Sequence, residues 1–390
     1  MAFTSSIEGI TVNEFFAAAA SFVVTLAAIA ALRHVAFRID LVDRPGGHKT
    51  HHGEVPIIGG LGMFLGIVTG IGLLDHPIVY SGPLLSAISL LVLLGLLDDR
   101  FSLSPWTRLP VQATAAIVAM YGTHTFVTTL GAPFGSELHL NSVISPIVTV
   151  VLMVASINAF NMLDGMDGLA GIVAAITFAG LGYMAHRAGL PLSPYIAIVV
   201  IASVLAFLVF NAPLIWNNHI RCFMGDAGST FLGLAVAWIG IRLSQAAGER
   251  SVAPVTVLWL VGLPLFELLW TFGRRLLKGQ SPFRGDTQHF HHLMIRGGFS
   301  VRGAFLMFAL LAAILCVTGI LLEIHDVPDS VSLLLLLTSG IVIILSIRSA
   351  RVIRRLMPRA LIRDDSTHPS VQMEREMQIE IENSSSRGIG

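Results

Sequence analysis

The sequence has few charged residues. Asp, Glu, Lys and Arg make up 12% of its 390 residues, whereas 54% are apolar. Soluble domains carry about 25% charged residues, so this composition excludes an ordinary soluble globular protein. Long apolar runs recur along the chain, and together with the low charge they indicate an integral membrane protein.

Cysteine, a cleavable leader and internal repeats are also missing or scarce. Cys222 and Cys316 are the two cysteines, and neither expected position favours a disulfide. The first apolar run has no preceding basic region and no convincing cleavage site, so we expect a retained span rather than a signal peptide. No repeat is evident, which weighs against an inverted-repeat transporter.

The apolar runs predict an all-α integral membrane protein with about 11 transmembrane helices. Residues 1–347 are expected to form one polytopic domain. Residues 348–390 are expected to be a basic cytoplasmic segment near the membrane followed by a disordered tail. The expected spans lie near 12–34, 57–74, 83–97, 109–126, 143–160, 169–186, 194–211, 229–245, 253–272, 301–322 and 329–347.

Basic residues fix the expected orientation, because Lys and Arg are retained on the cytoplasmic side. Of the 24 basic residues, all except Arg187, Arg242 and Arg250 fall in or beside the odd-numbered breaks between spans and the C-terminal tail. We therefore expect these breaks and the C-terminus in the cytoplasm and the N-terminus outside. The breaks that carry polar motifs would then converge on one face of the bilayer.

The first motif is the adjacent pair Asp98 and Asp99 at the end of the third expected span. Two carboxylates there repel each other and are partly desolvated, so a cation or hydrogen bonds must offset the cost. The functional interpretation is a general base, a magnesium contact, or one of each. The alternative is a pair of solvated loop acids neutralised by Arg100.

Two further motifs combine acids with glycines. Asp164 and Asp167 alternate with glycines that let backbone approach a ligand closely, although a turn with a helix cap would look similar. Asp226 lies among small residues just before an expected helix, where phosphate is attracted and a carboxylate can hold Mg²⁺. Phe223 is an aromatic residue placed to stack on a base, and a plain capping turn is the alternative.

Histidines dominate the remaining motifs. His289, His291 and His292 follow the ninth expected span, and an anion-binding or catalytic cluster is preferred to solvated histidines or a zinc site, whose usual spacing is absent. The first cytoplasmic loop carries Lys49 among histidines, and a solvated loop is equally compatible with it. Glu267 is the single acid in the interior of an expected span rather than near its end, and nothing in the sequence assigns it a role.

Acids for Mg²⁺, cationic loops for phosphates and an aromatic for a base together predict phosphoryl transfer from a nucleotide, with a lipid as acceptor. A nucleotide-sugar or metal transporter would need more polar residues near the midplane of the spans. A non-catalytic scaffold would not need this concentration of acids.

The four motifs, in this order, resemble the polyprenyl-phosphate N-acetylhexosamine-1-phosphate transferases over roughly residues 35–325. The likeness is closest to the branch that uses UDP-N-acetylglucosamine (UDP-GlcNAc). It implies transfer of GlcNAc-1-phosphate to undecaprenyl phosphate with release of UMP, as the initiating step of surface-glycan synthesis of the O-antigen type. UDP-MurNAc-pentapeptide or a deoxy-amino sugar is the alternative donor.

The resemblance also implies roles for individual residues. Asp226 would hold the catalytic Mg²⁺, which Mn²⁺ could replace, with Asp98 and Asp99 as further metal contacts or bases. Phe223 would stack on uracil, and Asp167 would lie near it. The other expected contacts with donor, phosphates or sugar are Asn161, Asp164, Asn211, Lys49, Arg284, His289, His291 and His292.

The implied setting is a bacterial inner membrane, with the active site on the cytoplasmic face of the domain formed by residues 1–347. The implied partners are the UDP-sugar, undecaprenyl phosphate and the lipid bilayer, with no nucleic acid. Gly62, Gly66 and Gly70 recur at four-residue spacing. This pattern favours close helix packing within the subunit, and a homodimer face is the second interpretation.

Overall fold

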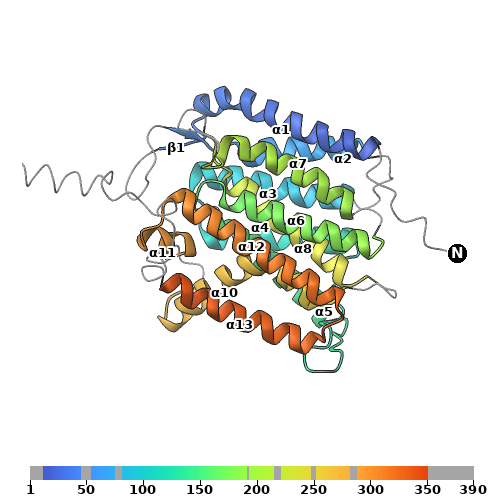
Figure 1. Cartoon of the computed structure of the whole chain (residues 1–390). Coiled ribbons are helices and arrows are strands. Elements are labelled where there is room, and N and C mark those ends of the chain that lie inside the picture. Colours follow the sequence, from blue (N-terminus) through green and yellow to red (C-terminus); the bar gives the residue numbers. More distant parts are fainter. Residues whose placement is uncertain are drawn as a thin grey trace, which may run out of the picture.

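The structure, a computed structural model, describes residues 12–44, 54–74, 81–190, 193–214, 221–246, 252–281 and 288–349. Most of these residues are helical, and the long helices lie side by side in one bundle (Figure 1). The expectation of an all-α membrane protein is confirmed. The only sheet in the described ranges is a small ladder of two strands, each two residues long. In lipid, helices satisfy their backbone polar groups internally, which explains this architecture.

The first half of the bundle contains α1 to α7 and the small ladder. In the ladder, β1 (Val42–Asp43) pairs antiparallel with β2 (Val55–Pro56). The helices are α1 (Val12–Arg38), α2 (Gly59–Gly72), α3 (Ser81–Phe101), α4 (Pro105–Gly122), α5 (Ile144–Leu163), α6 (Leu169–Arg187) and α7 (Ser193–Asn211).

The second half contains α8 to α13, of which two helices are short. The helices are α8 (Gly225–Ser244), α9 (Pro254–Leu260), α10 (Gly262–Leu277), α11 (Phe290–Arg296), α12 (Val301–Ile324) and α13 (Asp329–Arg348). The expected tail at 348–390 lies outside the described residues except for its first two positions.

The expected number of about 11 spans is not confirmed. Seven described helices are long and apolar enough to cross a membrane, or eight if the bent pair α9 and α10 counts as one span. The segments expected near 57–74, 83–97 and 109–126 correspond to α2, α3 and α4, which are not among them. The helix α2 has 14 residues, about 21 Å at 1.5 Å per residue, which is short of a ~30 Å hydrocarbon core.

The span expected at 253–272 is also interrupted. The helices α9 and α10 meet at an angle of 84°, and the break falls at Val261. Pro264 follows within the first turn of α10 and has no backbone N–H to donate, which favours a break in the helix at this point. Because of this bend, α10 does not continue the direction of α9. Its last turn, with Arg274 and Arg275, therefore lies at the candidate site, and Arg275 lines the cavity there.

The burial of the helices separates a centre from a periphery. Of an apolar stretch of 18 residues in α8, 83% is buried, compared with 22% of the corresponding stretch in α1 and 28% in α13. The helix α8 packs against α3, α5, α2 and α6. It is therefore the central element of the bundle, whereas α1, α12 and α13 present apolar side chains outward.

The repeated glycines of α2 face neighbouring helices of the same chain. A Cβ at Gly62 would meet Ile29 of α1, and one at Gly66 would meet Thr25 of the same helix. A Cβ at Gly70 would meet Val199 of α7. The interpretation of these glycines as packing positions within the subunit is confirmed, and their interpretation as a dimer face is wrong.

The two ends of the bundle are built differently. At one end lie the ladder and α11, together with the turns between α5 and α6 and before α8 (Figure 1). At the other end, Gln245 accepts hydrogen bonds from the amides of Thr128 and Thr129, and Asp329 accepts one from Ala132. The polar motifs lie at the first end, as the alternation of spans predicted.

Candidate active site

An arginine joins two acids from different helices. The Arg108 Nη1 atom lies 2.5 Å from an Asp98 carboxylate oxygen and 2.9 Å from an Asp226 oxygen. Ser104 caps α4 by accepting from the Thr107 amide, and Pro105 occupies its first position, so Arg108 lies in the first turn. The helices α3, α4 and α8 therefore meet at one charged group, and Asp226 is 118 residues from Arg108 in the sequence.

Asn161 holds the second acid in place. Its side-chain amide donates to the Asp226 Oδ1 atom over 2.7 Å and to the Ser229 hydroxyl over 3.2 Å. Asp98 is fixed in a similar way, since its Oδ1 atom accepts from the Leu103 amide over 2.6 Å. Each acid thus uses one oxygen for orientation and turns the other toward Arg108.

Asp99 differs from its neighbour in what it binds. One of its oxygens accepts from the Asp226 amide over 3.0 Å, and the other lies 3.5 Å from the Ala227 amide. Gly225, with a φ of +73°, leaves room for this approach, because a Cβ there would meet the Asp99 carboxylate. Asp99 therefore caps the N-terminus of α8. Burial raises the pKa of its carboxyl to about 7, although the two amides partly offset this effect.

The turn between α5 and α6 carries the next two acids. Asp164 follows the last residue of α5; burial raises the pKa of its carboxyl well above the ordinary value, and the charges of Asp226 and Asp99 raise it further. Asp167 lies 3.5 Å from the guanidinium of Arg221. The two acids lie in the turn itself rather than on one face of the following helix.

Asn211 connects this turn to the segment before α8. Its side-chain oxygen accepts from the Gly168 amide over 2.6 Å, and its nitrogen donates to the Cys222 carbonyl over 2.8 Å. Phe223 is held by its backbone, which donates to Pro56 and accepts from Gly59. Both residues lie near the acids, but neither lines the cavity described next.

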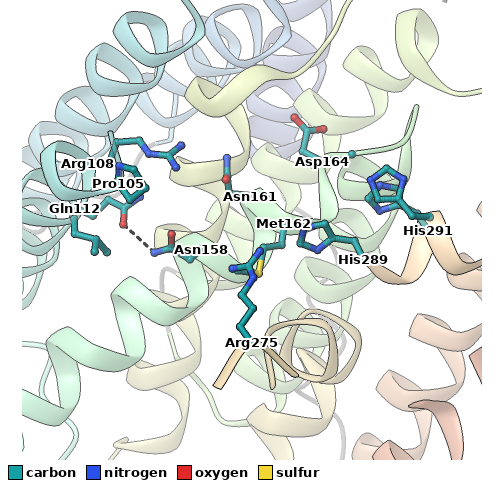
Figure 2. Close-up of a pocket in the computed structure, with 13 residues that line it drawn as sticks. Pro105, Arg108, Gln112, Asn158, Asn161, Met162, Asp164, Arg275, His289 and His291 are labelled. Atoms are coloured by element: carbon teal, nitrogen blue, oxygen red, sulfur yellow. Dashed lines mark hydrogen bonds between the residues drawn. The ribbon is translucent and has the colours of Figure 1, made fainter. Parts of the chain in front are cut away.

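A cavity of about 460 Å³ opens beside the acid cluster. Side chains from α4, α5, α10 and α11 surround it (Figure 2). Its lining includes Asn161, Asp164 and the three histidines, which belong to segments that the motifs predicted to converge. It also includes Arg108 of α4 and Arg275 of α10, which no motif contains. The full lining is Pro105, Arg108, Leu109, Gln112, Asn158, Asn161, Met162, Asp164, Gly165, Arg275, His289, His291 and His292.

The histidines form a compact cluster at the start of α11. The His291 and His292 rings lie 4.1 Å apart between centroids, and His289 stacks on His291 at 5.8 Å. His291 is buried, and neither of its ring nitrogens has a hydrogen-bond partner among the described residues. Burial lowers the pKa of His291 well below the ordinary value, so we expect a neutral ring at pH 7. A Cβ at Gly165 would overlap this ring.

Several cavity residues were missed by the sequence analysis. Arg108 and Arg275 supply cations, and Gln112 accepts a hydrogen bond from Asn158 over 2.8 Å. The sequence did contain a signal for the two arginines, because Arg108 and Arg275 lie between expected spans, on the side predicted to be cytoplasmic and near the motifs. Arg100 was the predicted neutralising partner of the acid pair if both acids were solvated. In the structure Arg100 lies 3.2 Å from Asp40 instead, and Arg108 takes that role.

Two predicted contacts cannot be placed, because Lys49 and Arg284 lie outside the described residues, as do the histidines at 48, 51 and 52. Among the residues that the structure does describe, no three His, Cys, Asp or Glu side chains group as a metal site. The nearest arrangement is the pair of oxygens, one each from Asp98 and Asp226, that share the Arg108 nitrogen. Mg²⁺ is usually held by one or two carboxylates together with phosphate and water, and this pair fits that pattern.

Comparisons with known proteins identify the class. Residues 82–244 match the model of glycosyl transferase family 4. The chain is similar to the undecaprenyl-phosphate alpha-N-acetylglucosaminyl 1-phosphate transferase of Escherichia coli strain K12, with 36% identity over 84% of this chain and 90% of that protein.

Proteins of the same name show the same relation. The Salmonella typhi protein is 37% identical over 87% of this chain and 93% of its own length. The Haemophilus influenzae protein is 38% identical over 76% and 84%, respectively. The chain therefore belongs to glycosyl transferase family 4, and the resemblance drawn from the four motifs is confirmed.

Proposed function

We propose that this protein transfers GlcNAc-1-phosphate from UDP-GlcNAc to undecaprenyl phosphate, giving undecaprenyl-diphospho-GlcNAc and UMP. The observation that carries the proposal is the meeting of Asp98, Arg108 and Asp226 beside a cavity lined by histidines and a second arginine. The names of the relatives supply the substrates. We further propose that the product initiates a lipid-linked surface glycan.

The proposed chemistry exchanges one phosphate linkage for another. An oxygen of the lipid phosphate attacks the β-phosphorus of UDP-GlcNAc, and the bond from that phosphorus to the UMP oxygen breaks. A phosphate monoester has its second pKa near ~6 and is mostly dianionic at neutral pH. The acceptor therefore needs little help from a base, and the site has to position two anions and neutralise their charge.

Each part of the site has a task in this scheme. Arg108 and Arg275 offset the negative charge of the phosphates, and Asn161 keeps Asp226 in the orientation it has here. The histidines at the start of α11 offer hydrogen bonds to the phosphates or the sugar. Phe223 is proposed to stack on uracil with Asp167 nearby, while Asp164 lines the donor site.

Mg²⁺ is the proposed cofactor, with Mn²⁺ as a substitute. When bound, the ion neutralises charge on the diphosphate and fixes its orientation. Asp226 and Asp98 would hold it through the oxygens that now face Arg108, and Arg108 would serve the phosphates. Activity should disappear in EDTA and return when Mg²⁺ or Mn²⁺ is added.

The role of Asp99 favours direct attack over a covalent intermediate. Both of its oxygens accept hydrogen bonds from amides at the start of α8, so attack by this carboxylate on phosphorus would require these bonds to break. In a covalent route, labelled UMP would enter UDP-GlcNAc without lipid acceptor. Direct attack requires undecaprenyl phosphate for this exchange.

We propose that the site faces the cytoplasm of a bacterial inner membrane, with the N-terminus in the periplasm. The distribution of Lys and Arg supports this orientation. The donor is a soluble nucleotide sugar and the acceptor phosphate sits at the membrane surface, so a site at one end of the bundle can receive both.

The donor is tested by assaying purified protein with undecaprenyl phosphate against a panel of UDP-sugars. We expect turnover with UDP-GlcNAc and little with UDP-MurNAc-pentapeptide or UDP-linked deoxy-amino sugars. A preference for one of the other donors would reject the proposed substrate while leaving the chemistry in place.

A further inference from the structure

Glu267 is an acid in α10 with no role in the scheme above. Its side chain is fully buried, with 0% exposure. A buried carboxylate is costly unless it is paired and hydrogen-bonded. Its partners should therefore indicate why it is present.

Three donors surround the carboxylate. The Thr271 hydroxyl donates to Oε1 over 3.1 Å, and His289 Nδ1 lies 2.8 Å from the same oxygen. The Phe290 amide donates to Oε2 over 2.9 Å. Two of these donors belong to the segment that begins the histidine cluster, so Glu267 fastens that segment to α10.

The contact with His289 also determines which ring nitrogen carries hydrogen. An ionised carboxylate only accepts hydrogen bonds, so in that state Glu267 requires Nδ1 of His289 to donate. The bond made at one nitrogen fixes the tautomer at the other. His289 lines the cavity with a side chain that is 12% exposed (Figure 2), and Nε2 is the nitrogen that Glu267 leaves available.

We propose that Glu267 is a positioning residue for the transfer reaction and acts through His289. It holds hydrogen on Nδ1 and fixes the ring so that Nε2 serves the bound donor. Carboxylates that orient histidines in this way are frequent behind metal-binding histidines, where their loss lowers function. The proposal rests on the proposed function, because it assigns His289 a contact with the UDP-sugar.

A purely structural role would use a different atom. Capping of α11 needs only the bond from Phe290 to Oε2, whereas orientation of the ring needs the bond from His289 to Oε1. A glutamine at this position has one oxygen. If that oxygen faces Phe290, its NH₂ group faces Nδ1 and forces the hydrogen of a neutral ring onto Nε2.

The test measures kcat and KM for UDP-GlcNAc with full-length protein carrying Glu267→Gln, His289→Ala or both. We expect Glu267→Gln to lower kcat by about 10- to 100-fold. In the His289→Ala background the same change should cost less than about twofold, because the coupling is between these two residues. Thr271→Val is the matched control, since it removes another donor from the same oxygen and leaves His289 in place.

Two kinetic results would overturn the proposal. One is a Glu267→Gln enzyme with normal kcat, and the other is a full additional loss in the His289→Ala background, which would indicate capping alone. A wild-type protein that is inactive with UDP-GlcNAc would instead reject the proposed function.

A measurement on the unmodified side chain covers the case in which Glu267→Gln does not fold. Full-length protein with ¹⁵N-labelled histidine is compared by NMR with the His289→Ala variant to assign the ring signals. Hydrogen on Nδ1 of His289 is the expected result, in either protonation state of the ring. A ring with hydrogen on Nε2 alone contradicts the proposal whether or not turnover is observed.

Discussion

At the scale of single residues, the account depends on the division of work among four acids. Asp98 and Asp226 turn oxygens toward Arg108, Asp99 turns both of its oxygens to α8, and Asp164 is half-buried and close enough for the charges of Asp226 and Asp99 to raise its pKa. The adjacent carboxylates at 98 and 99 therefore have different surroundings despite the same chemistry. This division predicts different consequences for mutating each acid.

Asp226→Asn should reduce turnover by about 10²- to 10³-fold, the usual effect of removing one group that stabilises developing charge. The protein should remain folded, because Asn161 and Arg108 still have other partners around the site. The measurement is lipid-product formation in saturating Mg²⁺, with size-exclusion behaviour in detergent as the folding check. The control is Glu137→Gln, an exposed acid near the opposite end of the bundle. Near-normal activity of Asp226→Asn would remove this residue from the proposed metal site.

Gly165→Ala should displace the His291 ring, since the added Cβ would occupy the same space. The ring is buried and has little freedom to move, so the cost falls on the geometry of the cavity. We expect kcat/KM for the UDP-sugar to fall by about tenfold or more, as small displacements at active sites commonly cause. Gly72→Ala is the matched control, because nothing lies within 4 Å of a Cβ there. Equal activity of the two variants would show that the close approach of Gly165 to His291 is unimportant.

At the scale of elements, α8 is positioned by a cap from another helix. Asp99 in α3 binds the first amides of α8, and α8 carries Asp226. Asp99→Ala removes both acceptor oxygens from these amides, and the loss of such a cap typically costs about 0.5–2 kcal/mol. We therefore expect a lower Tm in detergent together with reduced activity. Full thermal stability with no activity would point instead to a chemical role for Asp99.

Sequence patterns predicted the elements that carry the motifs better than the paths between them. The third and fifth expected spans end within a few residues of α3 and α5, because the motifs themselves break the apolar runs. The bend at Val261 was missed, although Gly262 and Pro264 beside it are residues that favour a break in a helix. The role of Arg108 was missed because its partner Asp226 is 118 residues away.

Glu267 illustrates the same limit. Its position inside an apolar span was evident from the sequence, but its partners were not. The bent path of α10 brings it to His289, which lies 22 residues further along the chain. Hydrophobic periodicity carries no information about such pairs, because they are set by tertiary packing.

At the scale of the whole molecule, the account requires the polar motifs to face the cytoplasm. A cysteine at Gln288 should react with an impermeant maleimide only from the cytoplasmic side, and one at Glu137 only from the periplasmic side. The natural cysteines Cys222 and Cys316 are buried, so they should give little background. The control is the unmodified protein labelled after membrane disruption.

The reverse labelling pattern would overturn the proposed orientation. The convergence of the motifs at one end of the bundle would remain, because it rests on contacts within the chain such as those of Arg108. The soluble donor would then have to reach the site from the periplasm, which contradicts the proposed use of a cytoplasmic nucleotide sugar.

In the proposed reaction, the β-phosphorus of the donor moves to the lipid together with the sugar. The most direct test gives the purified protein UDP-GlcNAc labelled with ³²P at the β-phosphate, together with undecaprenyl phosphate and Mg²⁺. The account predicts that the label enters the lipid fraction while unlabelled UMP is released in equal amount. Label that remains in released UDP, with only the sugar on the lipid, would contradict it.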